Sequence, residues 1–179
     1  MTLILETERI NLRRWEDDDR IPFARMNGDP LIMEYLPRAM TESDSNKLVD
    51  RFIKHFDKHN YGLYVLERKE DGAFMGFTGL QRVPFKAHFT PATEIAWRLD
   101  YEFWGQGYAS EAAKAVLAHG FEDCGLAEVV AFSVFDNKRS IGVMEKIGMS
   151  EVKDGAFDYP KLPKGHPLGS FVLYHASQN

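Results

Sequence analysis

The most constraining feature of the sequence is a stripe of small and apolar residues that begins directly after a pair of glycines. Over residues 107–123 such residues recur at the three- and four-residue spacing of a single helix face. The members of the stripe are Ala109, Ala112, Ala113, Val116, Leu117, Gly120 and Phe121. Because small side chains let a helix approach its neighbour closely, this stripe predicts a helix packed on a β-sheet.

The two glycines, Gly105 and Gly107, lie between a predicted strand at 93–100 and the start of this helix. Glycine permits a tight turn and a close approach to a ligand. The first N–H groups of a helix also form a natural anion site, so a phosphate or pyrophosphate is the expected guest. No lysine follows as in a P-loop, and Ser110 stands where a Rossmann pattern requires glycine or alanine. A tight turn without a ligand is the alternative.

The remaining pattern predicts an α+β fold with a mixed sheet and two helical layers. An antiparallel meander in the first half precedes alternating strands and helices in the second. Strands are expected at 9–14, 62–69, 73–81, 93–100, 127–134, 150–154 and 170–176, and helices at 17–28, 44–59, 107–123 and 137–147. Residues 155–169 hold three prolines and three glycines and predict a long ordered loop. The length of 179 residues predicts a single domain over 1–179.

Net charge and hydropathy narrow the function classes. The formal net charge is −5, and the basic runs at 10–14 and 137–139 are short, so we expect no nucleic-acid partner. No uncharged apolar stretch approaches the roughly 18 residues of a membrane span, and 3–5 is too short for a signal-peptide core. We therefore expect a cytoplasmic protein that does not associate with a membrane.

Cysteine and histidine patterns predict no metal site. The one cysteine, Cys124, excludes an internal disulfide. Its acidic neighbours Glu122 and Asp123 should raise the thiol pKa, so we expect it to be unreactive. His55 and His59 are four residues apart on a predicted helix, but the polar residues beside them suggest a solvent face.

Three segments carry a resemblance to a known family. They are 94–100 (Glu-Ile-Ala-Trp-Arg-Leu-Asp), 104–112 (Trp-Gly-Gln-Gly-Tyr-Ala-Ser-Glu-Ala) and 137–149, which opens with Asn137 and contains Ser140. Together they resemble the GCN5-related N-acetyltransferase (GNAT) superfamily, and within it the Rim-type branch of ribosomal-protein and protein N-terminal acetyltransferases. The resemblance covers most of the chain and implies a mixed, mostly antiparallel sheet of about seven strands. That sheet would be flanked by helices and splayed at the cofactor site.

The resemblance implies acetyl-CoA as co-substrate and a role for each matching position. Backbone groups of one strand would pair with the pantetheine arm: Ile95, Ala96, Trp97, Arg98 and Leu99. Backbone amides of the glycine turn would hold the pyrophosphate: Gly105, Gln106, Gly107, Tyr108, Ala109 and Ser110. Asn137 would contact the pantetheine region, and Ser140 would protonate the departing thiolate.

The chain departs from the branch pattern near the expected acceptor site. Ala96 stands where the branch has glycine, and Trp97-Arg98 replaces Tyr-Trp, which places a cation on the substrate side. The resemblance favours the amine of a protein or peptide N-terminus as acceptor, with the enzyme a monomer or homodimer. Two alternatives stay open: a small amine (a polyamine, aminoglycoside or amino acid), or a non-catalytic acyl-CoA sensor.

Direct attack of the amine on the thioester needs no protein nucleophile, but it needs a proton acceptor. Glu94, at the start of the strand expected against the acetyl group, is the first candidate for general base. Alternatively, Glu94 pairs with a neighbouring arginine. Further candidates for the base are His88, Asp158, Tyr159 and His166. The acidic run 16–19 could attract a basic acceptor, although an exposed helix start explains it equally well.

Overall fold

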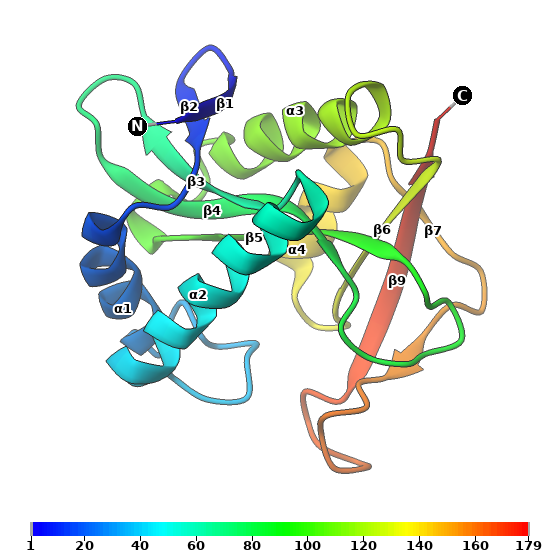
Figure 1. Ribbon diagram of the computed structural model, residues 1–179. Coiled ribbons are helices and arrows are strands. Elements are labelled where there is room, and N and C mark those ends of the chain that lie inside the picture. Colours follow the sequence, from blue (N-terminus) through cyan, green and yellow to red (C-terminus); the bar gives the residue numbers. More distant parts are fainter. Residues whose placement is uncertain (1, 179) are drawn as a thin grey trace.

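The computed structural model describes residues 2–178, which form nine strands and four α-helices (Figure 1). The strands are β1 (Leu3–Glu6), β2 (Ile10–Arg13), β3 (Leu63–Arg68), β4 (Phe74–Arg82), β5 (Thr93–Leu99), β6 (Glu128–Val134), β7 (Ser150–Glu151), β8 (Phe157–Asp158) and β9 (Ser170–Ser177). The helices are α1 (Arg20–Gly28), α2 (Glu42–His59), α3 (Tyr108–Glu122) and α4 (Lys138–Lys146). Short 3-10 turns at Asp17–Asp19 and Tyr101–Phe103 precede α1 and the glycine turn.

All nine strands belong to one sheet. Its order is β1-β2-β3-β4-β5-β6-β9-β7, and β8 pairs with the other end of β9. Every neighbouring pair is antiparallel except β5 and β6, which are parallel and are joined through α3. The prediction of a mixed, mostly antiparallel sheet is therefore confirmed, and antiparallel strands from both ends of the chain enclose one central βαβ unit.

The structure differs from the predicted strands mainly where strands are short. β1 and β8 were not predicted, and β7 is confined to Ser150–Glu151 rather than 150–154. Strands of two residues show too little alternation to be recognised, and β7 and β8 form because the longer β9 offers free backbone groups. The four-residue β1 pairs with β2, which has the same length. The predicted loop at 155–169 accordingly contributes β8 to the edge of β9.

Two of the predicted helices begin at different residues than expected. α2 starts at Glu42 because Thr41 accepts a hydrogen bond from the backbone of Asp44, which caps the helix two residues earlier. The predicted helix at 17–28 begins with the 3-10 turn and becomes α-helical only from Arg20. The bounds of α3, which joins β5 to β6, and of α4, which follows β6, lie within one residue of the predicted bounds.

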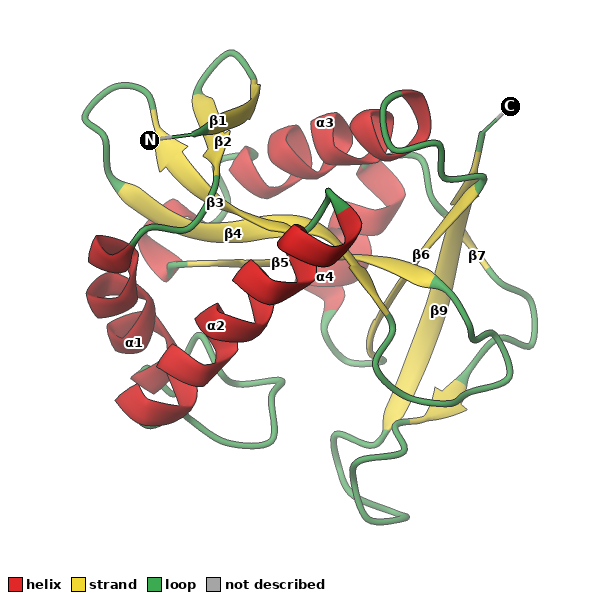
Figure 2. Ribbon diagram, in the orientation of Figure 1, coloured by secondary structure: helices red, strands yellow, loops and turns green. Residues whose placement is uncertain are grey.

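Helices cover both faces of the sheet (Figure 2). Alternate residues of β3 show the two layers, since Leu63 and Val65 pack in the cluster of α1 and α2, whereas Tyr64 and Leu66 pack in the cluster of α3 and α4. All four are buried, as expected of a strand covered on both sides. The small-residue stripe of α3 lies directly on the sheet, and a Cβ on Gly120 would come within 2.9 Å of a Leu80 methyl group.

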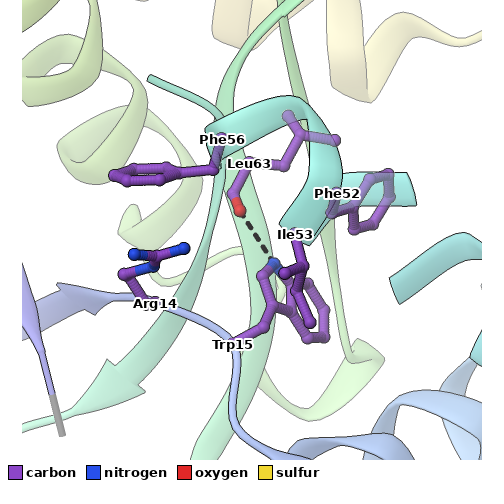
Figure 3. Close-up of a pocket in the computed structure, with 6 residues that line it drawn as sticks. All are labelled: Arg14, Trp15, Phe52, Ile53, Phe56 and Leu63. Atoms are coloured by element: carbon purple, nitrogen blue, oxygen red, sulfur yellow. Dashed lines mark hydrogen bonds between the residues drawn. The ribbon is translucent and has the colours of Figure 1, made fainter. Parts of the chain in front are cut away.

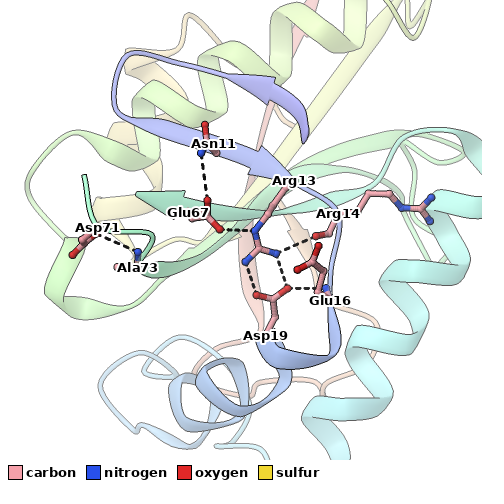
Figure 4. Close-up of polar contacts among 8 residues, drawn as sticks. All are labelled: Asn11, Arg13, Arg14, Glu16, Asp19, Glu67, Asp71 and Ala73. Atoms are coloured by element: carbon pink, nitrogen blue, oxygen red, sulfur yellow. Dashed lines mark hydrogen bonds and ion pairs between the residues drawn. The ribbon is translucent and has the colours of Figure 1, made fainter. Parts of the chain in front are cut away.

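A buried arginine joins α1 to the sheet (Figure 4). Arg13 on β2 donates to Glu67 on β3 at 2.7 Å and to both carboxylate oxygens of Asp19 at 2.7 and 2.8 Å. These hydrogen bonds, led by the one to Asp19, raise the pKa of Arg13. Because Asp19 is buried in this contact, the acidic run 16–19 is not simply the exposed helix start that was one of its two interpretations.

Candidate active site

The sheet opens between β5 and β6. The two strands share one residue pair, Glu94 with Val130, and no pairing continues along the rest of β5. On its other side β5 stays paired with β4 from Thr93 to Leu99. Residues 95–99 therefore keep one edge of backbone groups without a strand partner among residues 2–178, which is the splay that the family resemblance implied. An extended chain of amides could pair with that edge.

The glycine turn closes the C-terminal side of this opening. Gly105 and Gly107 have φ of +72° and +84°, in the left-handed region that favours glycine. A Cβ on Gly105 would meet nothing within 4 Å, so the turn exposes bare backbone. Gly107 is the N-cap of α3, whose first amides point toward the same space. Bare backbone at the glycines and free N–H groups at a helix start are the features of an anion site.

Arg9 clamps this turn, a contact that sequence reasoning missed. Its Nη1 donates to the carbonyl oxygen of Gln106 at 3.1 Å, and its Nε and Nη2 bind Glu111 Oε2 at 2.7 and 2.6 Å. The guanidinium also lies 4.2 Å from the ring centroid of Tyr108. Residues about a hundred positions apart make these contacts, so no local pattern could have revealed them. They hold the turn and the first turn of α3 in one arrangement.

Asn137 and Ser140 form a pair at the start of α4, beyond the end of β6. The side-chain oxygen of Asn137 caps the helix by accepting from the backbone N–H of Ser140 at 3.2 Å. The Asn137 amide donates to Ser140 Oγ at 3.1 Å. Since that bond uses the hydroxyl as an acceptor, the O–H proton is left to donate elsewhere. The cap and a proton-donating role are therefore compatible.

Glu94 belongs to the one residue pair that joins β5 to β6. It is 7% exposed, and Gln81 Nε2 donates to its Oε1 at 2.7 Å. Burial raises the pKa of Glu94 to about 8, against the smaller lowering effects of Gln81 and of the Lys161 charge. Among residues 2–178 it makes no ion pair with a basic side chain within 4 Å, so the alternative that it pairs with a neighbouring arginine is wrong.

The long loop 155–169 reaches Glu94 with one of the predicted side chains. Burial and then the Glu94 charge raise the pKa of Tyr159, which places the phenol within electrostatic range of that carboxylate. Two other candidates for the general base make contacts within their own loops. His166 accepts a hydrogen bond from the backbone of Leu168, and His88 packs on Phe89. Asp158 is exposed on β8.

A second link crosses the opening from α4. Arg139 forms an ion pair with Glu34 at 2.8 Å and lies 4.2 Å above the ring centroid of Trp104. Trp104 in turn donates to the carbonyl oxygen of Leu99 at the end of β5. The segment between α1 and α2, which contains Glu34, is thereby joined to α4 beside Ser140. Because Trp104 directly precedes Gly105, this link lies next to the glycine turn, at the C-terminal end of β5.

The cavity shown in Figure 3 is not a substrate site. Trp15 donates to the carbonyl oxygen of Leu63 at 2.7 Å, and aromatic rings fill the space around them. The cavity measures about 10 Å³, which is at most the room of one water molecule. Its lining consists of Arg14, Trp15, Phe52, Ile53, Phe56 and Leu63.

Metal binding, thiol reactivity and membrane insertion find little support in residues 2–178. No group of three or more histidine, cysteine, aspartate or glutamate side chains could hold a metal ion there. His55 is half-buried and binds backbone atoms of Tyr61 and Arg82, which corrects the expected solvent face. Burial and the neighbouring Asp123 raise the pKa of the Cys124 thiol, as predicted. In that part of the chain no helix is long and apolar enough to cross a bilayer.

The comparisons with known proteins agree with this geometry. Residues 9–150 match the family model of the acetyltransferase (GNAT) domain. The chain therefore belongs to the GNAT acetyltransferase family, and it is an acetyl-CoA-dependent N-acetyltransferase.

The chain is similar to two curated relatives and shares its fold with one solved structure. The chain is 31% identical over 164 residues to the uncharacterized N-acetyltransferase YnaD of Bacillus subtilis, covering 90% of this chain and 89% of YnaD. It is 29% identical over 167 residues to FsC-acetyl coenzyme A-N(2)-transacetylase of Aspergillus fumigatus, covering 90% of this chain and 71% of that protein. A structure of RimL, a ribosomal L7/L12 alpha-N-protein acetyltransferase in complex with coenzyme A, has the same fold. It superposes with a TM-score of 0.78 at 16% identity, over 98% of this chain and 97% of RimL.

Proposed function

We propose that this chain, acting as one domain over 1–179, acetylates the amine of a protein or peptide N-terminus. The observation that carries the proposal is Glu94, a buried carboxylate with a pKa of about 8 at the inner end of the β5–β6 opening. A free α-amino group has a pKa of about 7.7–8.0, whereas a lysine side chain has one of about 10.4. A base of this strength is matched to an α-amine.

Acetyl-CoA fits the opening in two places. The unpaired edge of 95–99 offers backbone groups to the amides of the pantetheine arm, and the glycine turn offers free N–H groups to the pyrophosphate. The solved RimL structure, which holds coenzyme A, supports the same use of this fold. Bound there, acetyl-CoA supplies a thioester that an amine can attack.

In the proposed reaction Glu94 and Ser140 handle the two proton transfers. The carboxylate of Glu94 takes the proton of the attacking amine, either directly or through one water. As the new C–N bond forms and the C–S bond breaks, the hydroxyl of Ser140 donates its proton to the sulfur, and the proton that Glu94 took returns through water to the Ser140 oxygen. Asn137 holds Ser140 Oγ from the opposite side and so directs that proton into the opening. No covalent enzyme intermediate is required.

A small-molecule amine is the second candidate acceptor. The relative that is 29% identical to this chain is named as an N(2)-transacetylase of FsC, not as a protein acetyltransferase. We therefore treat the peptide and the small amine as competing substrates in one test.

The test measures release of free coenzyme A thiol from acetyl-CoA with three kinds of acceptor: N-terminal peptides without lysine, free amino acids, and spermidine. We expect peptides with a free α-amine to react, and the same peptides with a blocked N-terminus to give only background. Faster release with a small amine than with any peptide would contradict the peptide proposal. Binding of acetyl-CoA without transfer to any amine would support the sensor alternative.

A further inference from the structure

Arg98 is a half-buried cation that meets no carboxylate in the described part of the chain. It lies on β5, and among residues 2–178 its guanidinium makes no ion pair within 4 Å. Burial lowers the pKa of Arg98 to about 10, which leaves it charged at neutral pH. A charge removed from water without an opposite charge is costly, so folded proteins seldom keep one unless it binds something.

Two contacts, with Asn27 of α1 and Phe77 of β4, hold the guanidinium in position. Its Nη1 donates to Asn27 Oδ1, and its Cζ lies 5.5 Å from the ring centroid of Phe77. Asn27 is fully buried, and its own amide donates to Ser45 Oγ on α2 at 2.9 Å. The chain from Ser45 through Asn27 orients the arginine but supplies no negative charge. Of the five N–H donors of the guanidinium, this contact uses one.

Arg98 and Glu94 point to the same face of the sheet. Side chains alternate along a strand, and Ala96 between them packs in the cluster of α1 and α2, whereas Ile95 and Leu99 pack on the α3 side. The backbones of Glu94 and Arg98 are about 13 Å apart along the strand, from the rise of about 3.3 Å per residue.

We propose that Arg98 binds a carboxylate of the acceptor, so that the preferred substrate is a peptide with aspartate or glutamate within its first three residues. This inference rests on the proposed function, because Glu94 fixes where the amine lies. From an amine at Glu94, two residues of an extended peptide cover about 7 Å, and the side chains of the peptide and of Arg98 would bridge the rest. Arginine binds a carboxylate with two parallel hydrogen bonds, which the free donors of this guanidinium can supply.

The charges that surround the opening agree with an acidic acceptor. Lys161 lies within electrostatic range of Glu94, and Arg51 of α2 lies within range of Tyr159. A polyamine would bring further positive charge toward Lys161, Arg51 and Arg98. The same reasoning therefore predicts that spermidine is a poor substrate.

The first experiment uses the unaltered enzyme and matched peptide amides without lysine. Ala-Asp-Ala-Ala-Phe amide and Ala-Ala-Asp-Ala-Phe amide are compared with the same peptides carrying asparagine in place of aspartate, and release of coenzyme A thiol is measured. We expect kcat/KM to be about 10- to 100-fold higher for at least one aspartate peptide, the range of a charge-assisted hydrogen bond. Equal values for the aspartate and asparagine peptides, or a preference for spermidine, would overturn the inference.

The second experiment assigns the preference to Arg98. Arg98→Gln should raise KM for the preferred aspartate peptide to that of its asparagine counterpart and leave kcat unchanged. Arg98→Lys should restore part of the difference. Arg38→Gln, which removes an exposed arginine that pairs with Asp44, is the matched control and should behave as wild type. An equal loss on both peptides in Arg98→Gln would make Arg98 structural and would refute the proposal.

The two proposals fail in different ways. If no amine of any kind releases coenzyme A thiol, the acetyl transfer to an α-amine is wrong. If neutral peptides are good substrates and acidity makes no difference, only the role of Arg98 is wrong. If free glutamate reacts better than every peptide and loses that advantage in Arg98→Gln, the anion site stands and the peptide acceptor is replaced by an amino acid.

Discussion

Replacing Glu94 by glutamine should change how the stability of the fold depends on pH. The folded state holds this proton up to about pH 8, whereas the unfolded chain releases it near the ordinary value of 4.5. A raised pKa means that the proton stabilises the fold fully below about pH 4.5 and that this stabilisation is lost as the pH rises toward 8. At 1.36 kcal/mol for each pH unit, the whole window amounts to about 5 kcal/mol.

Glutamine keeps the shape and can still accept the hydrogen bond of Gln81, but it has no proton to lose. Urea unfolding of wild type and Glu94→Gln at pH 5 and pH 8 measures the effect. The free energy of unfolding of the variant should gain several kcal/mol on that of wild type between the two pH values. Glu70→Gln, in the exposed hairpin turn, should follow wild type. Parallel behaviour of Glu94→Gln and wild type would show that the carboxylate is already ionised at pH 5, which would refute the argument from burial.

The same variant links this proton to turnover: with a peptide acceptor, Glu94→Gln should flatten the acidic limb of the pH–rate profile, and its deficit should shrink above about pH 8, where the free amine predominates. Gly107→Val should abolish acetyl-CoA binding in calorimetry, whereas Gly125→Val, an equally left-handed glycine at the far end of α3, should cost stability but leave affinity unchanged. Ser140→Ala should lower turnover about 10²–10⁴-fold with little change in cofactor affinity, and full turnover would assign the proton to water. Asn137→Asp should keep the helix cap and the melting temperature but slow turnover, because the carboxylate would accept the Ser140 proton. Arg13→Met should cost about 3–5 kcal/mol in urea unfolding, since it leaves buried carboxylates without their partner.

The parts of the fold that were predictable depend on local pattern. The stripe from Ala109 to Phe121 gave α3, because burial on a sheet imposes a helical period that a sequence displays directly. The glycine turn was predictable for the same reason, since left-handed φ at Gly105 and Gly107 restricts which residues can stand there. β1 and β8 were not, because each is short and exists through pairing with a strand that lies elsewhere in the sheet.

The roles of the candidate site residues stay a prediction, and the electrostatics of the site could not be predicted from the sequence. The family resemblance marked Glu94, Asn137 and Ser140, yet the pKa of Glu94 depends on the layers above and below β5. The partner of Glu94 was also out of reach, because Gln81 becomes its neighbour only through the register of β4 with β5. The grip of Arg9 on the turn arises in the same way, from a hairpin brought to α3 by folding.

The single residue pair that joins β5 to β6 has a consequence for the exchange of amide hydrogens with solvent. Every second amide of 95–99 is bonded to β4, and the alternate ones face the opening without a strand partner. In the free enzyme this central strand should show a mixed pattern, with neighbouring amides of one strand exchanging slowly and quickly in turn. Acetyl-CoA would then act as the missing neighbour and slow the fast set. Deuterium uptake along β5 thus records occupancy of the opening directly, without any acceptor present.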